Sequence, residues 1–130
     1  MHLKIITHEK IVFDNEVDEL VVNTTSGQIG VLKDHIPITT SLKIGITKVK
    51  INDNSKCFAT MGGVFQFKNN NAVILTDVCE ESCDIDVARA KAAKERAEAR
   101  LAESSAEIDA KRAEAALARA LARLQASLNK

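Results

Sequence analysis

Six arginines, all in the last third of the 130-residue chain, are the side chains whose type and spacing could bind a ligand. They form two sets with members spaced by seven and four residues: Arg89, Arg96 and Arg100, then Arg112, Arg119 and Arg123. These spacings place each set along one face of an α-helix. Guanidinium forks from two neighbouring helices can converge on one phosphate group. The alternative is a solvated helix face on which acidic residues four positions away pair with the arginines.

The sequence shows no catalytic constellation. His2, His8 and His35 are scattered, and no Ser, His and Asp occur in an order that suggests nucleophilic catalysis. Cys79 and Cys83 are four residues apart but lack the second pair of Cys or His that a zinc site requires. Buried or half-buried thiols are the simpler interpretation. We therefore predict a protein with no catalytic residue and no metal site.

Composition and charge argue against several classes of protein. Eighteen basic and eighteen acidic residues cancel, which disfavours a nucleic-acid module or a polybasic membrane anchor. With no Trp, no Tyr and four Phe, the chain also lacks aromatic platforms for base stacking. Three cysteines without a leader-like segment indicate a reduced compartment and no disulfide framework. No stretch approaches the roughly 20 apolar residues of a membrane span, so we expect membrane association only through a partner.

The composition changes sharply near Asp84. Before it, short runs of β-branched residues alternate with turn residues, which is typical of a β-sandwich. We predict strands at residues 3–7, 11–13, 17–23, 29–32, 44–51, 56–61, 64–68 and 72–78, with a bulge or bend between Ile46 and Val49. After it, sixteen of forty-five residues are Ala and none is Gly or Pro, which favours helix. The predicted fold is an antiparallel β-sandwich domain over residues 1–84, followed by an antiparallel two-helix hairpin over 85–130.

The hairpin is predicted to have a thin apolar seam. Ser104 and Glu107 have the spacing of a capping box, so a first helix begun at Asp86 would end there and a second would start. The predicted buried stripes are Val87, Ala90, Ala93, Ala97 and Leu101 on the first helix, and Ala110, Ala113, Leu117, Leu121, Leu124 and Leu128 on the second. Alanine removes little apolar area from water. We therefore expect the hairpin to be marginally stable by itself.

Four motifs, in order along nearly the whole chain, resemble the epsilon subunit of F-type ATP synthase in its bacterial or chloroplast form. They are residues 26–32 (SGQIGVL) with 34–37 (DHIP), 61–65 (MGGVF), 85–90 (IDVARA), and 111–114 (KRAE) with Arg119 and Arg123. The chain departs from the family pattern at Cys79 and Cys83, where small residues are expected, and at Val64, where Phe is more usual.

The resemblance implies a non-catalytic central-stalk subunit of the rotor, coupling the gamma subunit to the membrane c-ring. Positions that match the family's ring-facing or gamma-facing edge are Gly27, Gln28, Ile29, Gly30, Asp34 and His35. The hairpin resembles an inhibitor of ATP hydrolysis with two placements, folded on the sandwich or extended along gamma into the alpha/beta catalytic head. The implied location is peripheral, at the cytoplasmic face of a bacterial plasma membrane or the stromal face of a thylakoid membrane.

The resemblance also implies a regulatory ligand, because the folded hairpin of some bacterial members binds ATP. The positions carried over are Glu80, Ile85, Asp86, Arg89, Arg119 and Arg123, with Arg96 as an additional candidate. Our hypothesis places the arginines on the phosphates and Asp86 near the base or ribose, with no cofactor required. The alternative is a purely structural rotor coupler whose arginine faces are docked permanently on a partner, without nucleotide sensing.

Overall fold

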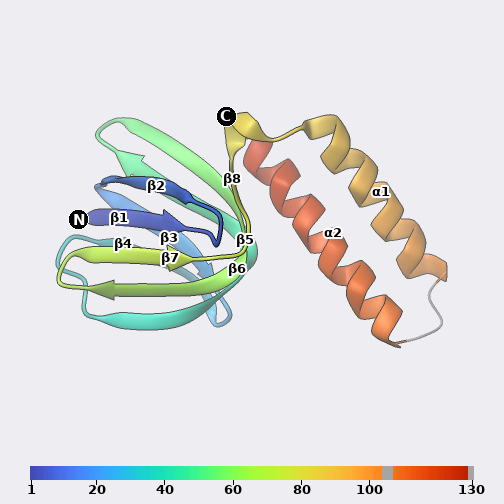
Figure 1. The fold of residues 1–130 in the computed structure, drawn as a ribbon, viewed down its shortest axis with the longest axis horizontal. Coiled ribbons are helices and arrows are strands. Elements are labelled where there is room, and N and C mark those ends of the chain that lie inside the picture. The colour runs from blue at the N-terminus through green and yellow to red at the C-terminus, as the bar shows by residue number, and fades with distance from the viewer. Residues whose placement is uncertain (104–106, 129–130) are drawn as a thin grey trace.

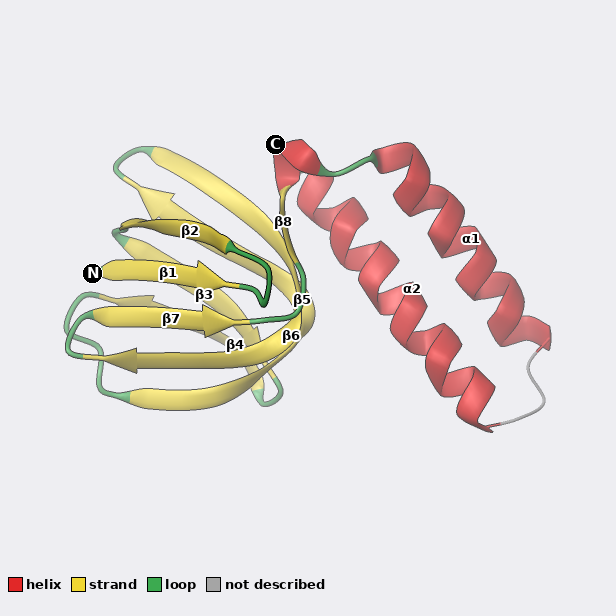
Figure 2. Cartoon of the chain, viewed as in Figure 1, coloured by secondary structure: helices red, strands yellow, loops and turns green. Residues whose placement is uncertain are grey.

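The elements follow the order expected from the sequence, strands first and helices last. The structure is a computed structural model that describes residues 1–103 and 107–128. Within these residues the strands are β1 (His2–Ile6), β2 (Ile11–Glu16), β3 (Glu19–Thr24), β4 (Gly27–Leu32), β5 (Ile38–Ile51), β6 (Asn54–Lys68), β7 (Asn71–Leu75) and β8 (Cys79–Glu81). A short 3-10 helix, η1 (Ser82–Asp84), precedes α1 (Val87–Glu103) and α2 (Glu107–Ser127). Figures 1 and 2 show the strands as a sandwich with an antiparallel helix pair beside it, which confirms the predicted fold class.

The two longest strands, β5 and β6, connect the layers of the sandwich. Hydrogen-bonded neighbours follow the order β2-β1-β7-β6-β5-β3-β4, and β8 pairs separately with β6. These pairs are antiparallel except β1 with β7. With 14 and 15 residues, β5 and β6 are long enough to curve from one layer into the other, because β-sheets twist.

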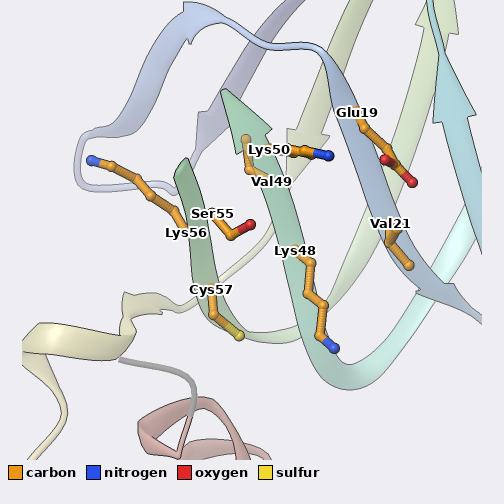
Figure 3. A pocket seen from close by; sticks show the side chains of 8 residues that line it. All are labelled: Glu19, Val21, Lys48, Val49, Lys50, Ser55, Lys56 and Cys57. Atoms are coloured by element: carbon orange, nitrogen blue, oxygen red, sulfur yellow. The ribbon is translucent and has the colours of Figure 1, made fainter. Parts of the chain in front are cut away.

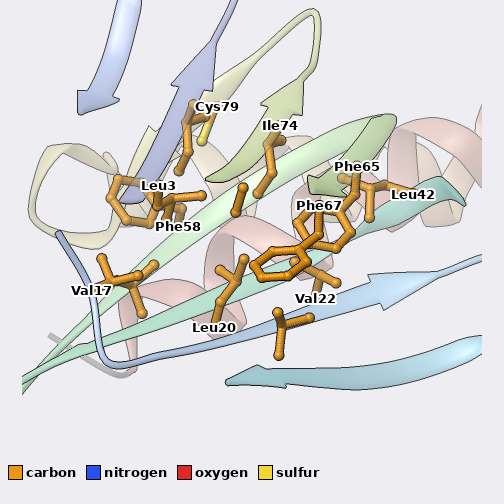
Figure 4. Close-up of a cluster of buried hydrophobic side chains, with 14 residues drawn as sticks. Leu3, Val17, Leu20, Val22, Leu42, Phe58, Phe65, Phe67, Ile74 and Cys79 are labelled. Atoms are coloured by element: carbon orange, nitrogen blue, oxygen red, sulfur yellow. The ribbon is translucent and has the colours of Figure 1, made fainter. Parts of the chain in front are cut away.

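The core of the sandwich lies between these layers (Figure 4). Its buried members are Leu3, Ile5, Val17, Leu20, Val22, Val31, Leu42, Val49, Phe58, Phe65, Phe67, Ala72, Ile74 and Cys79. Most alternate along their strands with exposed or half-buried residues, as side chains on successive strand positions point to opposite faces. Burying one large apolar side chain contributes about 1.5–3 kcal/mol. The sandwich therefore has a core that does not depend on the hairpin.

The predicted irregularity in β5 lies in its pairing with β3. The β5–β6 register is continuous, whereas the β3–β5 register shifts beside Asn23. There the Asn23 Nδ2 donates a hydrogen bond to the carbonyl oxygen of Ile46 at 3.0 Å. Glycine at position 45 leaves room for this side chain, since a Cβ would lie 2.9 Å from Nδ2. Ile46 packs beneath the hairpin and Val49 in the sandwich core, which explains the break in alternation.

Several strand boundaries differ from the prediction. The segments predicted at 56–61 and 64–68 form one strand, β6, which bends through Gly62 and Gly63 at φ of 80° and 120°. A Cβ on Gly63 would lie 2.1 Å from the carbonyl oxygen of Leu75, so the bend requires glycine. Strand β5 begins six residues earlier than predicted, and the prediction lacks β8. Between β6 and β7 the chain turns at Asn69 and Asn70, which both have positive φ, as asparagine tolerates.

Helix α2 lies between the sandwich and α1 (Figure 2). It contacts β5, β6 and η1, and its other face packs on α1. The apolar contact with the sandwich is a small cluster that we call the docking patch: Ile46, Cys57, Ala59, Ile85 and Ala126, with Met61 at its margin. Because most of these side chains are short, the patch removes little apolar area from water.

The predicted stripe on α1 is confirmed by the burial of Ala90 and Ala97. On α2 the prediction is partly wrong, because Leu121 and Leu128 are 44% and 85% exposed. Among the α2 side chains that the structure describes, the buried ones are all alanines: Ala113, as predicted, and Ala120, Ala122 and Ala126. Alanine allows α2 to approach both α1 and the sheet, whereas leucine would hold them apart. The predicted capping box lies outside the described residues at Ser104, as does the side chain of Glu107.

Candidate functional site

A cavity of about 470 Å³ lies where the hairpin meets β8 and η1. Its lining residues are Glu80, Asp84, Asp86, Arg89, Ala90, Ala93, Arg96 and Arg123. The volume falls in the range of small-molecule sites, roughly 300–1,000 Å³. Five of the seven residues predicted to bind ATP line it, namely Glu80, Asp86, Arg89, Arg96 and Arg123. We call it the arginine cavity.

Helical spacing explains how α1 contributes to the arginine cavity. Arg89, Ala93 and Arg96 follow one another at intervals of four and three residues, so they share a face. The short side chain of Ala93 leaves space between the two guanidinium groups. Asp86 caps the helix, because its Oδ1 accepts a hydrogen bond from the backbone N–H of Arg89 at 3.1 Å. Such a cap contributes about 1 kcal/mol to helix stability, and here it fixes where α1 begins.

An ion pair crosses the arginine cavity from α2 to β8. Arg123 Nε donates to Glu80 Oε1 at 3.0 Å, and Arg123 Nη2 lies 2.9 Å from the same oxygen. The two side chains are 28% and 32% exposed, so the pair is partly shielded from water. This fork-like contact is charge-assisted and directional. It ties the hairpin to the sandwich.

The remaining guanidinium groups of the arginine cavity are available to a ligand. Among the residues that the structure describes, those of Arg89 and Arg96 have no ion-pair partner, whereas Lys94 on the same helix pairs with Glu98 at 3.7 Å. This arrangement does not fit a solvated face on which acidic residues neutralise each arginine. It can accept anionic oxygens from phosphate groups.

Two residues predicted to bind ATP do not line the arginine cavity. Ile85 is 5% exposed and packs in the docking patch. Arg119 is half-buried on α2 but is not a lining residue. Conversely, the prediction lacks Asp84, Ala90 and Ala93, which do line it. Ala90 and Ala93 were detectable as positions on the predicted apolar stripe. Asp84 had no signal beyond its closeness in sequence to Asp86.

The arginines of one set do not all line the same cavity. Arg100 and Arg112 line a separate cavity of about 370 Å³ near the far end of the hairpin, with Glu103, Asp109 and Ala113.

A third cavity, of about 300 Å³, is a groove on the sandwich (Figure 3). Its lining residues are Glu19, Val21, Lys48, Val49, Lys50, Ser55, Lys56 and Cys57. None of the predicted site residues lies there.

The positions predicted to face the c-ring or gamma run along one edge of the sandwich. Gly27, Gln28, Ile29 and Gly30 belong to β4, which ends the strand order and so presents an edge. Asp34 and His35 lie in the loop after β4. Beside them, Leu32 and Ile36 are 57% and 73% exposed. The prediction thus falls on an edge strand and a loop with exposed apolar side chains.

This loop is held in place by contacts from β6 and its turn. The backbone N–H of Asp34 donates to Asn70 Oδ1 at 2.7 Å, and Asn70 Nδ2 donates to Asp34 Oδ1 at 3.0 Å. The ring of His35 meets Phe67 edge-on, with centroids 5.8 Å apart. The reciprocal hydrogen bonds support the positive φ of Asp34, 65°. The loop therefore presents Ile36 from a fixed backbone.

The three thiols differ in accessibility. Cys57 and Cys79 are buried, and Cys83 is exposed, so the expectation of buried thiols is wrong for Cys83. Burial raises the pKa of Cys79 to about 11, although Thr60 acts in the opposite direction. One donor atom each from Glu81, Cys83 and Asp84 lies within 4.8 Å of the others. Surface clusters of this kind are common without an ion, and we assign no metal to it.

The β-sandwich followed by an arginine-bearing helical hairpin matches two family models along the chain. The ATP synthase delta/epsilon chain β-sandwich domain matches residues 1–82, and the long α-helix domain of the same chains matches residues 84–127. These domains define a class of accessory, non-catalytic chains. The protein belongs to the ATP synthase delta/epsilon chain family, whose members are part of a membrane-associated complex.

Similar chains occur in chloroplasts and bacteria. The chloroplastic ATP synthase epsilon chain of Gossypium barbadense is 44% identical over 101 residues, which cover 78% of this chain and 76% of that one. The ATP synthase epsilon chain of Desulforamulus reducens is 43% identical over 99 residues, which cover 76% of this chain and 75% of that one.

Neither helix that the structure describes combines the length and hydropathy that a bilayer crossing demands.

Solved structures share the fold over nearly the whole chain. A chain of the Euglena gracilis mitochondrial ATP synthase, in a structure of OSCP, F1 and c-ring, has a TM-score of 0.84 at 24% identity and covers 97% of this chain and 79% of that one. A chain from the Tetrahymena thermophila mitochondrial ATP synthase central stalk and c-ring has a TM-score of 0.65 at 12% identity, covering 98% and 96%. At these identities the likeness concerns the fold alone.

Proposed function

We propose that the chain is a central-stalk rotor subunit that joins the gamma subunit to the c-ring, and that its hairpin is a regulatory element. In this proposal ATP binds the arginine cavity and keeps the hairpin folded on the sandwich. Loss of ATP releases the hairpin, which then extends along gamma towards the alpha/beta head and inhibits ATP hydrolysis. The observation that carries the proposal is the arginine cavity itself, because it is built jointly by α1, α2 and β8.

The small docking patch supports a movable hairpin. Its members beneath and on α2 are mostly short side chains, and a buried CH₂ contributes only about 0.8 kcal/mol. A ligand at a hundred times its dissociation constant stabilises the state that it binds by about 2.7 kcal/mol. That amount is enough to reverse an equilibrium between two placements that differ by one or two kcal/mol. A hairpin with a broad leucine-rich interface would not respond to it.

The charged residues of the cavity have different roles in the proposal. In the proposal, the free guanidinium groups of Arg89 and Arg96 contact the phosphates, since each offers several N–H donors. Asp84 and Asp86 also line the cavity, and their carboxylates can accept hydrogen bonds from ribose hydroxyls or the adenine amino group. The contribution of Arg119 remains a prediction from the family resemblance.

The partners are proposed from the edge of the sandwich and from the relatives. The Euglena gracilis and Tetrahymena thermophila structures contain an F1 and c-ring assembly and a central stalk with c-ring, respectively. The exposed Leu32 and Ile36, beside the edge strand β4, offer apolar surface for such partners. In this arrangement the chain is peripheral, at the cytoplasmic face of a bacterial plasma membrane or the stromal face of a thylakoid membrane.

Titration calorimetry of the full chain with ATP tests the nucleotide proposal. We expect saturable heat with the unaltered chain and at least a tenfold weaker association for Arg96→Ala, because a charged hydrogen bond contributes about 1.5–3 kcal/mol. The matched control is Lys94→Ala, which removes one positive charge from α1 at a pair outside the cavity. No heat at millimolar ATP would leave the alternative, a structural rotor coupler without nucleotide sensing. Equal binding by Arg96→Ala would mean that ATP does not bind through the arginine cavity in the way proposed.

A further inference from the structure

The ion pair and the docking patch join the hairpin to the sandwich near the C-terminal end of α2. Arg123, which pairs with Glu80, and Ala126, which lies in the docking patch, are three residues apart and so lie within one helical turn. Figure 1 shows this C-terminal part of α2 beside β8, while the opposite end of the helix points away from the sandwich. An opening motion therefore needs only to break a short polar and apolar contact.

Glu80 stands on a rigid support. It belongs to β8, where it is the register partner of Ala59 on β6, and Ala59 is itself a member of the docking patch. Strand β8 is further connected to the interior, because the thiol of Cys79 lies 3.9 Å from Thr60 Oγ1, which shares a hydrogen bond of 2.8 Å with Thr47. Glu80 thus presents its carboxylate from a strand that belongs to the sandwich, and Arg123 reaches it only while α2 is docked.

We infer that Glu80 is a latch that raises the docked fraction of the hairpin in the nucleotide-free equilibrium, by acting as an internal anion on Arg123, although without ATP it does not hold the whole population docked. The guanidinium faces a cavity suited to anionic groups, yet its Nε and Nη2 are already within 3.0 Å of the Glu80 carboxylate. The latch and the proposed ATP site share this residue, so the inference deepens the proposed function. It concerns the nucleotide-free equilibrium, however, and can be tested without any nucleotide.

The chain contains its own reporters of docking. Cys57 is 3% exposed beneath the hairpin in the docking patch, so it becomes accessible when α2 leaves. Cys79 belongs to the sandwich core and remains covered while the sandwich is folded, whereas Cys83 is exposed in either placement. Labelling of the nucleotide-free full chain with N-ethylmaleimide, resolved by peptide mass spectrometry, measures all three thiols in one sample.

We expect Glu80→Gln to raise the labelling rate of Cys57 by more than about twofold and by up to about fivefold, since a partly exposed ion pair contributes up to about a factor of five to an equilibrium. The rate for Cys79 should not change. The matched control is Glu81→Gln, which makes the same change one residue along, at a pair with Lys56 within the sandwich. Combining Glu80→Arg with Arg123→Glu reverses the ion pair and should return Cys57 to the unaltered rate.

Two results would overturn the latch: Cys57 labelling in Glu80→Gln within twofold of the unaltered chain, or a reversed pair that labels as fast as Glu80→Gln. Either result can occur while ATP still slows Cys57 labelling in the unaltered chain, in which case the proposed function stands and the latch fails. If ATP has no effect but Glu80→Gln accelerates labelling, the latch stands and the nucleotide proposal fails.

Discussion

Truncation of Ile85 should release the hairpin without unfolding the sandwich. Ile85 is the largest side chain that the segment after η1 contributes to the docking patch, and it is 5% exposed. Ile85→Ala removes three carbons, which at about 0.8 kcal/mol each corresponds to about 2.4 kcal/mol of lost burial. Incomplete relaxation of the patch would add to this loss. The sandwich core contains none of the patch residues, so its stability should be unaffected.

The burial free energy lost in Ile85→Ala is close to the stabilisation of the docked hairpin that we expect from ATP. A ligand at a hundred times its dissociation constant adds about 2.7 kcal/mol, so saturating ATP should return Ile85→Ala to near its original degree of docking. Labelling of Cys57 with and without ATP measures both effects, and Cys79 reports on the sandwich. Leu121→Ala, which truncates a leucine on α2 that is 44% exposed, is the control and should not change Cys57 labelling.

Two outcomes would refute this reasoning. Unchanged labelling of Cys57 in Ile85→Ala would mean that the docking patch does not hold the hairpin. Faster labelling of Cys79 together with Cys57 would mean that the hairpin and the sandwich unfold as one unit, contrary to the separate cores that the structure shows.

Two further predictions concern the sandwich. Gly63→Ala should lower the free energy of unfolding by about 1–3 kcal/mol, since φ is 120° and the added Cβ would lie 2.1 Å from a carbonyl oxygen of β7. Gly30→Ala, with open space around its Cβ, should change it by less than about 1 kcal/mol. Equal melting temperatures of the two variants would contradict this. His2 has a raised pKa because it hydrogen-bonds two carboxylates of β2. Its stabilising contribution is therefore present below its unfolded pKa of 6.5 and is lost as the pH rises through the raised value. An NMR titration should place the midpoint of His2 above 6.5, and a midpoint at or below 6.5 would argue against the carboxylate contacts.

The residue pattern along the chain predicted most of the fold, because most strands and turns depend on residues that are neighbours in the sequence. The asparagine turn at Asn69 and Asn70 needs residues that tolerate positive φ, and the alternation of apolar residues identifies strand faces. Strand β8 could not be found in this way. Its three residues lack a strand pattern of their own and are extended because β6 supplies hydrogen-bond partners. The pair Gly62 and Gly63 reads locally as an interruption between two strands. Strand β6 nevertheless continues through it, because Gly63 has no Cβ and the carbonyl group of Leu75 in β7 can approach its backbone closely.

The sequence by itself determined which arginines share a helix face, because the angle between side chains along one helix depends only on their spacing. It also shows a change from strand-forming to helix-forming residues near Asp84. Only the tertiary structure decided that Arg89, Arg96 and Arg123 share a cavity while Arg100 and Arg112 line another. That outcome depends on how α2 is rotated about its axis. The rotation is determined by packing against α1 and the sheet together, and short alanines rather than leucines allowed that approach.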